Sequence, residues 1–152
     1  MPTPPRSSNN SREPGVVSGL TDLAQILRTL DVDVRPEPYV YATVDPSHPA
    51  VADAQATVAE REGVTLVLRR SDADAHGLSG EFVSAWLTLT VHSSLEAVGL
   101  TAAFSSALGR AGISCNVLAG FHHDHILVPF DRRDDAVRAL RDLRQGVAAT
   151  DK

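Results

Sequence analysis

The chain has 152 residues, a formal net charge of −5 and a composition that is 43% hydrophobic and 22% charged, which suits one domain or two small units that share a core. The acidic balance, with no basic run interleaved with aromatic residues, speaks against nucleic acid as a partner. A single cysteine excludes an internal disulfide framework, and no apolar run approaches the roughly 18 residues of a membrane span, so we expect a cytoplasmic protein.

The first predicted elements are a tail and a helix. Residues 1–18 contain four prolines and a Ser/Asn cluster with almost nothing to bury, so we expect a disordered tail. Residues 19–31 should form a helix, because leucines recur there at helical spacing and define one buried face. These leucines are Leu20, Leu23, Leu27 and Leu30.

Two predicted strands and a short helix follow. Residues 38–44 alternate between apolar and mixed positions, as a half-buried strand does, and residues 63–70 form a second apolar strand. Between them, residues 45–61 are a Pro-started, Ala-rich loop with room for a short helix. Residues 71–78 are typical of a brief helix or turn, with Ser71 as a candidate N-cap and Gly77 as a candidate stop.

The second half of the chain has clearer patterns. Residues 85–92 alternate as a strand, and residues 95–113 carry apolar positions at helical spacing. Residues 115–122 and 125–130 are two further strands, joined through His123 and Asp124. A helix should then occupy residues 131–144.

Helix caps and a core can be predicted for this half. Gly112 stands where a left-handed C-terminal cap is expected, and Asp131 is the candidate N-cap of the last helix. Ser93 and Glu96 have the spacing of a capping box before the helix at residues 95–113. The side chains predicted to be buried are those of Leu89, Val91, Leu100, Phe104, Leu108, Val117, Val128 and Leu140.

A weak internal repeat relates the two halves. The sequence GLT opens a predicted helix at residues 19–21 and again at 99–101, and LVLRRSDADA in the first half corresponds to ILVPFDRRDDA in the second. The repeat predicts an α+β protein of two ferredoxin-like βαββαβ units, with antiparallel sheets and helices on one face. We expect the units at residues 19–80 and 81–146, followed by a tail at 147–152. How they share strands is left open.

Residues 86–130, WLTLTVHSSLEAVGLTAAFSSALGRAGISCNVLAGFHHDHILVPF, resemble the second half of small bacterial tandem ACT-domain proteins, and residues 19–85 fit the first half. The resemblance implies a regulatory role. We expect no catalytic activity and no cofactor, because the sequence has no other nucleophile and base motif, no phosphate loop and no paired-carboxylate signature. The resemblance also implies an amino-acid ligand, bound where the loop after a unit's first strand meets a neighbouring unit. Many ACT domains have a Pro-Gly pair in that loop, and here the pair is Val98-Gly99. We further expect a homodimer, because ACT-like sheets pair by edges or helices.

The stretch SCNVLAGFHHDH at residues 114–125 has several interpretations. As a metal site, it would supply His123 and His125 from one strand face, and a third ligand such as His92 would have to come from elsewhere. As a catalytic pair, it would need Cys115 close to a histidine, although small buried cysteines are common core residues. Both interpretations are weaker than the two that follow.

The stretch can also be a plain polar turn between two strands, or part of a ligand-binding surface. We favour binding: the free N–H groups at a helix start would hold an amino acid's carboxylate, and Asn116 with nearby carbonyls would hold its ammonium. The alternative function is a structural or interaction module that assembles with itself or with an enzyme without a ligand. The predicted ligand-binding residues are Ser94, Val98, Gly99, Leu100, Asn116, Gly120, His123 and Asp124.

Overall fold

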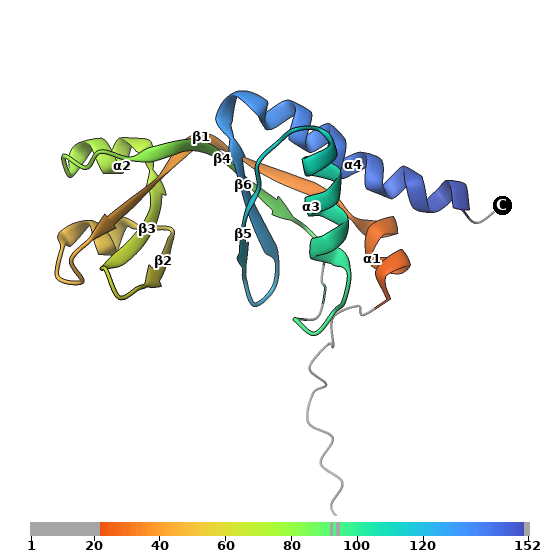
Figure 1. Ribbon diagram of the computed structural model, residues 1–152, viewed down its shortest axis with the longest axis horizontal. Coiled ribbons are helices and arrows are strands. Elements are labelled where there is room, and N and C mark those ends of the chain that lie inside the picture. Colours follow the sequence, from red (N-terminus) through yellow and green to blue (C-terminus); the bar gives the residue numbers. More distant parts are fainter. Residues whose placement is uncertain (1–21, 92, 94, 151–152) are drawn as a thin grey trace, which may run out of the picture.

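The protein is described by a computed structural model that covers residues 22–91, 93 and 95–150, with side chains up to residue 146 (Figure 1). Its strands form one six-stranded sheet in the order β2-β3-β1-β4-β6-β5, antiparallel throughout. The elements are α1 (Leu23–Thr29), β1 (Val32–Val44), the 3-10 helix η1 (Pro49–Asp53), β2 (Ala56–Ala59), β3 (Val64–Arg69), α2 (Arg70–Ala75), β4 (Glu81–Leu89), α3 (Leu100–Arg110), β5 (Asn116–Ala119), β6 (Asp124–Pro129), the 3-10 helix η2 (Phe130–Arg132) and α4 (Arg133–Thr150).

The two long strands β1 and β4 belong to both units. In the N-terminal unit, the second half of β1 is the first strand, and the start of β4 is the last strand, paired as Tyr39 with Ser84. In the C-terminal unit, β4 from Trp86 onward is the first strand, and the start of β1 supplies the last strand, paired as Val32 with Leu89. Each unit therefore has the predicted ferredoxin-like strand order, and each completes the sheet of the other.

Register shifts occur where β1 and β4 pass from one unit to the other. Val34 faces Leu87 but Pro38 faces Ala85, so β1 carries two extra residues at this bulge. An even insertion keeps the alternation of side chains in phase. A second shift lies in β4, where Phe82 has a φ of 54°. Such a positive φ is uncommon for an aromatic residue and marks local backbone strain.

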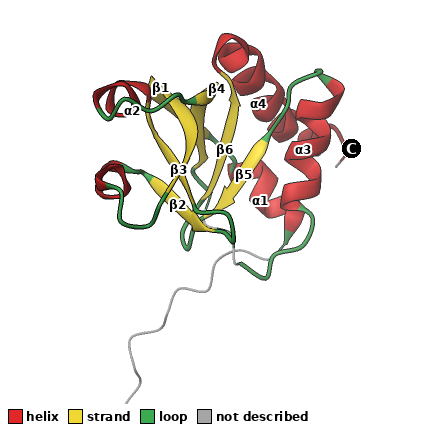
Figure 2. Cartoon of the chain, turned by 60° about the vertical axis from the view of Figure 1, so that its left-hand side comes forward, coloured by secondary structure: helices red, strands yellow, loops and turns green. Residues whose placement is uncertain are grey.

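Helices cover one face of the sheet, and Figure 2 shows α1, α3 and α4 together on one side of the molecule. Under these helices lies the larger core cluster, which includes Ile26, Leu87 and Phe104. A smaller cluster under η1 and α2 includes Leu66 and Leu68. The other face of the sheet carries no helix in the described part of the chain and is called the helix-free face below. It buries a third cluster, which contains Tyr39, Val67, Trp86 and Leu127.

Helix α1 packs on the C-terminal unit, although the sequence predicted it as the opening element of the N-terminal unit. Ile26, Leu27 and Leu30 lie in the larger cluster with α3 and α4. Helix α1 comes before β1, whose start closes the C-terminal unit, whereas α3 comes after β4, which opens that unit. The helices that follow the two GLT sequences are therefore not equivalent. The correspondence between β3–α2 and β6–α4 is confirmed.

Several predicted boundaries and caps differ from the structure. The strand at 38–44 begins earlier, at Val32, and the loop at 45–61 contains strand β2 as well as η1. Helix α3 starts only at Leu100 with Gly99 as N-cap, so the capping box of Ser93 and Glu96 is wrong. The N-cap of α2 is Arg69 instead of Ser71, Asp131 lies inside η2, and α4 continues to Thr150.

Other local predictions are confirmed. Gly77 and Gly112 have φ values of 67° and 68° at the ends of their helices, and the Ile113 N–H donates to the Leu108 carbonyl at 2.9 Å. This bond satisfies a carbonyl that the last turn of α3 would otherwise leave open. The predicted core side chains are buried, except that Val117 is only partly so.

Candidate ligand cavity

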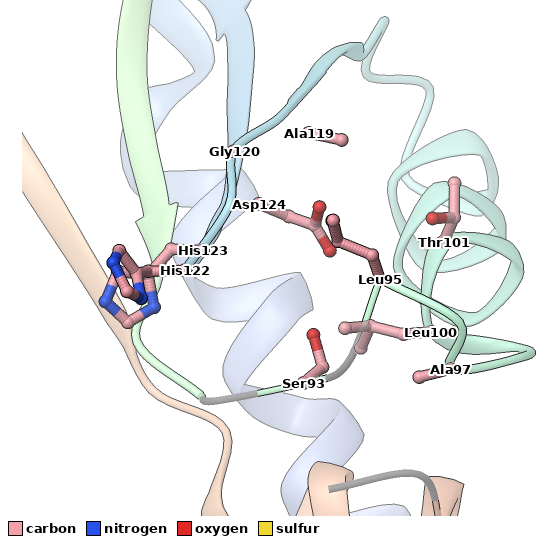
Figure 3. Close-up of a pocket in the computed structure, with 10 residues that line it drawn as sticks. All are labelled: Ser93, Leu95, Ala97, Leu100, Thr101, Ala119, Gly120, His122, His123 and Asp124. Atoms are coloured by element: carbon pink, nitrogen blue, oxygen red, sulfur yellow. The ribbon is translucent and has the colours of Figure 1, made fainter. Parts of the chain in front are cut away.

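A cavity of about 110 Å³ lies between the β4–α3 loop, the first turn of α3 and the β5–β6 turn (Figure 3). It lies at the edge of the C-terminal unit, where the loop after that unit's first strand meets the turn of its hairpin. Its walls combine small, apolar and ionisable side chains. They are Ser93, Leu95, Ala97, Leu100, Thr101, Ala119, Gly120, His122, His123 and Asp124.

The β5–β6 turn depends on glycine at position 120. The Gly120 N–H donates to the His123 carbonyl at 2.9 Å, and a Cβ on Gly120 would lie 2.7 Å from that same oxygen and 3.1 Å from Nε2 of His125. Any side chain there would displace the turn. The hairpin of the N-terminal unit closes in the same way, with the Glu60 N–H donating to the Gly63 carbonyl at 2.9 Å.

Asp124 supplies a carboxylate to the cavity. It is the first residue of β6 and faces Ala119 across the ladder, and Figure 3 shows its side chain directed toward Leu95 and the space before α3. Burial raises the pKa of this carboxyl, and the neighbouring His125 and His123 oppose that shift. A partly desolvated carboxylate gains from a cationic partner.

The opposite wall is the N-terminus of α3. Gly99 caps this helix with a φ of 99° and no side-chain hydrogen bond to the first turn. The first N–H groups of a helix have no intrahelical partner, and the helix dipole makes this end positive. Because Leu100 and Thr101 line the cavity, it has a positive wall at the helix start and a carboxylate at Asp124.

The histidines of residues 114–125 do not converge. In Figure 3 the rings of His122 and His123 lie on the side of the turn away from Thr101, and His123 Nδ1 lies 3.4 Å from the Val91 carbonyl oxygen. His125 lies on the helix-free face, where its Nδ1 accepts from Nε1–H of Trp86 at 3.2 Å. Within the described part of the chain, no three metal-ligating side chains form a metal site, and His92 lies outside it.

Cys115 does not have the surroundings of a nucleophile. It is partly buried and precedes β5, and burial raises the pKa of its thiol. A raised pKa keeps the group in the unreactive thiol form at neutral pH. The structure therefore offers no activated cysteine–histidine pair at this place.

Four of the predicted site residues line the cavity, namely Leu100, Gly120, His123 and Asp124. Val98 points to solvent with 84% of its surface exposed, and a Cβ on Gly99 would meet Cδ2 of Leu23 at 2.9 Å, so Gly99 faces α1 on that side. Ser94 lies outside the described residues.

Asn116 lies on the other face of the sheet. It pairs with Leu127, a member of the helix-free cluster, whereas Ala119 and Asp124 lie on the helix side. Strand alternation from Val117 could have identified Ala119 as the wall residue. The remaining wall residues that the sequence did not predict are Ser93, Leu95, Ala97, Thr101 and His122.

Two family models match the chain in tandem, both described as ACT domains, over residues 18–85 and 81–142. Their overlap falls at the start of β4, the strand that closes one unit and opens the other. The chain therefore belongs to the ACT-domain family and contains two ACT domains. No curated protein matches it, and no helix among the described residues is long and apolar enough to cross a membrane.

Among solved structures, the chain is similar to VC0802 from Vibrio cholerae, described as a protein of unknown function and possible transport protein, with 40% identity over 80% of this chain and 95% of that one, and a TM-score of 0.73. Atu0741 from Agrobacterium tumefaciens shares 18% identity over 76% and 89% of the two chains, with a TM-score of 0.56. The ligand-free regulatory subunit of aspartate kinase from Thermus thermophilus shares 11% over 74% and 95%, with a TM-score of 0.53. The last two likenesses concern the fold.

Proposed function

We propose that this protein is a non-catalytic regulator that binds a small amino acid in the cavity between the β4–α3 loop and the β5–β6 turn. Membership of the ACT-domain family and a chain occupied by two ACT domains support a regulatory role. The fold it shares with a regulatory subunit of aspartate kinase is consistent with this role. A cytoplasmic location and a homodimeric state are part of the proposal.

The observation that carries the proposal is the opposite charge of the two cavity walls. A free amino acid is a zwitterion, so its carboxylate can accept from N–H groups at the start of α3 while its ammonium donates to the Asp124 carboxylate. This arrangement gives Asp124 the role that the sequence assigned to Asn116. The volume of about 110 Å³ is below the several hundred Å³ of typical drug-sized pockets, which favours a small ligand.

The ligand would join two segments that meet only in the folded protein. A ligand that bridges the β4–α3 loop and the β5–β6 turn stabilises the conformation in which these two segments lie at the separation that the ligand spans. It shifts the equilibrium between this conformation and another one only by the difference in its affinity for the two. Since Gly99 in that loop packs against Leu23 of α1, a change in the loop would reach the helix layer.

A thermal-shift screen of the common amino acids, followed by calorimetry on the best one, tests the proposal. Ligand at 100 times its Kd adds about 2.7 kcal/mol to the stability of the native state. We expect Asp124→Asn to weaken binding by about tenfold or more, because a hydrogen bond between two charged groups is lost. The matched control is Asp134→Asn, whose side chain is 80% exposed on α4. No stabilising amino acid, or unchanged affinity in Asp124→Asn, would contradict the proposal.

A second candidate function is an interaction module that needs no ligand. Leu95, Val98 and Phe121 are exposed by 66%, 84% and 78%, and the β4–α3 loop and β5–β6 turn that carry them also form the cavity. Exposed apolar groups that gather at one place are typical of protein contacts. Light scattering on the chain and on Phe121→Ser tests this function: a dimer lost in the variant, with no ligand in the screen, would favour it.

A further inference from the structure

The helix-free face of the sheet contains a cation that has no acidic partner among the described residues. Arg35 lies in the bulge of β1 between Val34 and Pro38, and its guanidinium carbon lies 4.3 Å from the ring centroid of Trp86 and 5.7 Å from that of Tyr39. The aromatic rings are themselves packed, with centroids 5.2 Å apart. A bulge can redirect a side chain in this way, and stacking of this kind fixes the plane of a guanidinium.

Hydrogen bonds hold one end of the Arg35 side chain. Its Nη1 donates to the hydroxyl of Tyr39 at 3.3 Å and to Oε1 of Gln55 at 3.1 Å. Gln55 directly precedes β2 of the N-terminal unit, whereas Trp86 pairs with β6 of the C-terminal unit. The guanidinium is thus fixed at the junction of the two units, and both N–H groups of Nη1 are in use.

The other edge of the guanidinium is open. In the described residues no carboxylate lies within ion-pair distance of Arg35. No buried side-chain nitrogen or oxygen in the same part of the chain lacks a hydrogen-bond partner, so Nε and Nη2, which have none there, reach solvent. These two atoms form the edge that binds a carboxylate with two parallel hydrogen bonds.

A second titratable group, a histidine, lies beside the ring on which Arg35 stacks. His125 lies next to Trp86, with ring centroids 5.3 Å apart. Burial lowers the pKa of His125, and the charges of Arg35 and His123 lower it further, against the opposing charge of Asp124. A half-buried charge without a counterion gains free energy from an anion.

We propose that the open Nε–Nη2 edge of Arg35, stacked on Trp86 at the junction of the two units, binds the carboxylate of a small organic acid. This site is on the opposite face of the sheet from the cavity at Asp124 and does not depend on it. A bound carboxylate would complete the hydrogen bonds of a group that already joins Gln55 of one unit to the shared strands. Binding there would therefore stiffen the junction between the two ACT domains.

Fluorescence of Trp86 reports on this site, because it is the chain's single tryptophan. The protein is titrated with sodium acetate near neutral pH, against sodium chloride at equal ionic strength. We expect a saturable change with acetate alone. Phosphate, titrated in the same way, distinguishes the anion class: phosphate binding as tight as acetate would overturn the assignment to carboxylates.

Two variants of Arg35 distinguish the contribution of the open guanidinium edge from that of the positive charge. Arg35→Gln should abolish the saturable response, and Arg35→Lys should weaken it by about tenfold or more, because lysine keeps the charge but loses the fork. Arg110→Gln, which removes an exposed positive charge from α3, should respond as the unmodified chain does. Because Arg35→Gln also alters the surroundings of Trp86, the indole N–H resonance is followed by NMR as a second measurement. Retained acetate binding in Arg35→Gln, or an equal response to chloride, would overturn the proposal.

Discussion

The two ACT domains share one strand plan but differ in their helices. The C-terminal unit has helices of 11 and 18 residues, α3 and α4, where the N-terminal unit has only the 3-10 helix η1 of 5 residues and α2 of 6 residues. The cluster under the long helices is correspondingly larger, and α1 adds to it. The strand order is the same in both, because it depends on backbone pairing and hairpin turns, whereas the amount of buried apolar surface depends on helix length.

The turns that close the two hairpins also differ, in the polarity of their side chains. The N-terminal turn carries Arg61 and Glu62, and the equivalent positions of the C-terminal turn are Phe121 and His122. Charged residues keep an edge turn in solvent, while an exposed Phe121 beside a cavity is available for contact. The candidate cavity and the exposed aromatic side chain therefore both belong to the C-terminal unit, and the N-terminal unit supplies the strand that completes its sheet.

The largest expected effect comes from the core of the C-terminal unit. Phe104→Ala should lower the free energy of unfolding by about 3–5 kcal/mol, because it leaves a cavity in the larger cluster. Leu66→Ala should cost about 2–3 kcal/mol, at the lower end of the usual range, because fewer buried side chains surround Leu66 in the smaller cluster. Urea denaturation followed by circular dichroism and Trp86 fluorescence measures both.

The same measurement tests whether the units unfold together. Since β1 and β4 are shared, both variants should shift one transition, coincident for the two probes. A separate early transition in Leu66→Ala would show that the N-terminal unit unfolds by itself, against the strand-sharing argument.

A smaller effect is expected at the loop that enters α3. Gly99→Ala should cost about 1–3 kcal/mol, because alanine is strained at a φ of 99° and its Cβ would displace Leu23. The matched control is Gly109→Ala in the last turn of α3, where nothing lies near the added methyl group. That control should stabilise the protein by about 0.5 kcal/mol, the lower end of the gain expected inside a helix. Equal effects of the two substitutions in thermal denaturation would argue against the strained cap.

The smallest expected effect concerns the pH dependence of stability, to which two carboxyl groups should contribute with opposite sign. Burial raises the pKa of Asp124 in the folded protein, so its contribution makes stability fall as pH rises from the unfolded value near 3.8 to the folded pKa. Asp124→Asn should remove this penalty and stabilise the ligand-free protein at neutral pH. In the N-terminal unit, hydrogen bonds from Ser47 lower the pKa of Asp45.

Asp45 should therefore behave in the opposite way. Its stabilising contribution is present above the unfolded pKa near 3.8 and is lost as pH falls through the lower folded value. Denaturation curves of Asp124→Asn and Asp45→Asn between pH 3 and 7 compare the two groups. A loss of stability at neutral pH in Asp124→Asn would contradict the burial of this carboxyl.

Much of the fold was predictable because local patterns carry it. The alternation of Leu87 and Leu89 with Trp86 and Thr88 defines two faces of β4 whatever the partner strands are. Positive-φ glycines such as Gly112 also act locally, because the backbone itself demands them. Element boundaries were less predictable: residues 32–37 contain Pro36 and end next to Pro38, and they still join β1, because pairing with β4 and the bulge accommodate them.

The candidate site was only half predictable for a related reason. The sequence identified the β5–β6 turn and the start of α3, and with them Leu100, Gly120, His123 and Asp124. Asn116 lies on the face opposite to Val117, as strand alternation from the predicted core residue Val117 could have shown. The sequence could not identify Leu23 as the neighbour of Gly99, since that contact joins segments more than seventy residues apart.

The sequence by itself determined the class of the protein, two ferredoxin-like units, and the identity of the segments that surround the cavity. Their hydrophobic periods and turn residues act over a few positions and need no partner to be recognised. Only the tertiary structure decided that β1 and β4 close each other's units, that α1 covers the C-terminal unit, and that Arg35 stacks on Trp86. These features depend on contacts between distant segments, whose free energy is gained only when the whole sheet has formed.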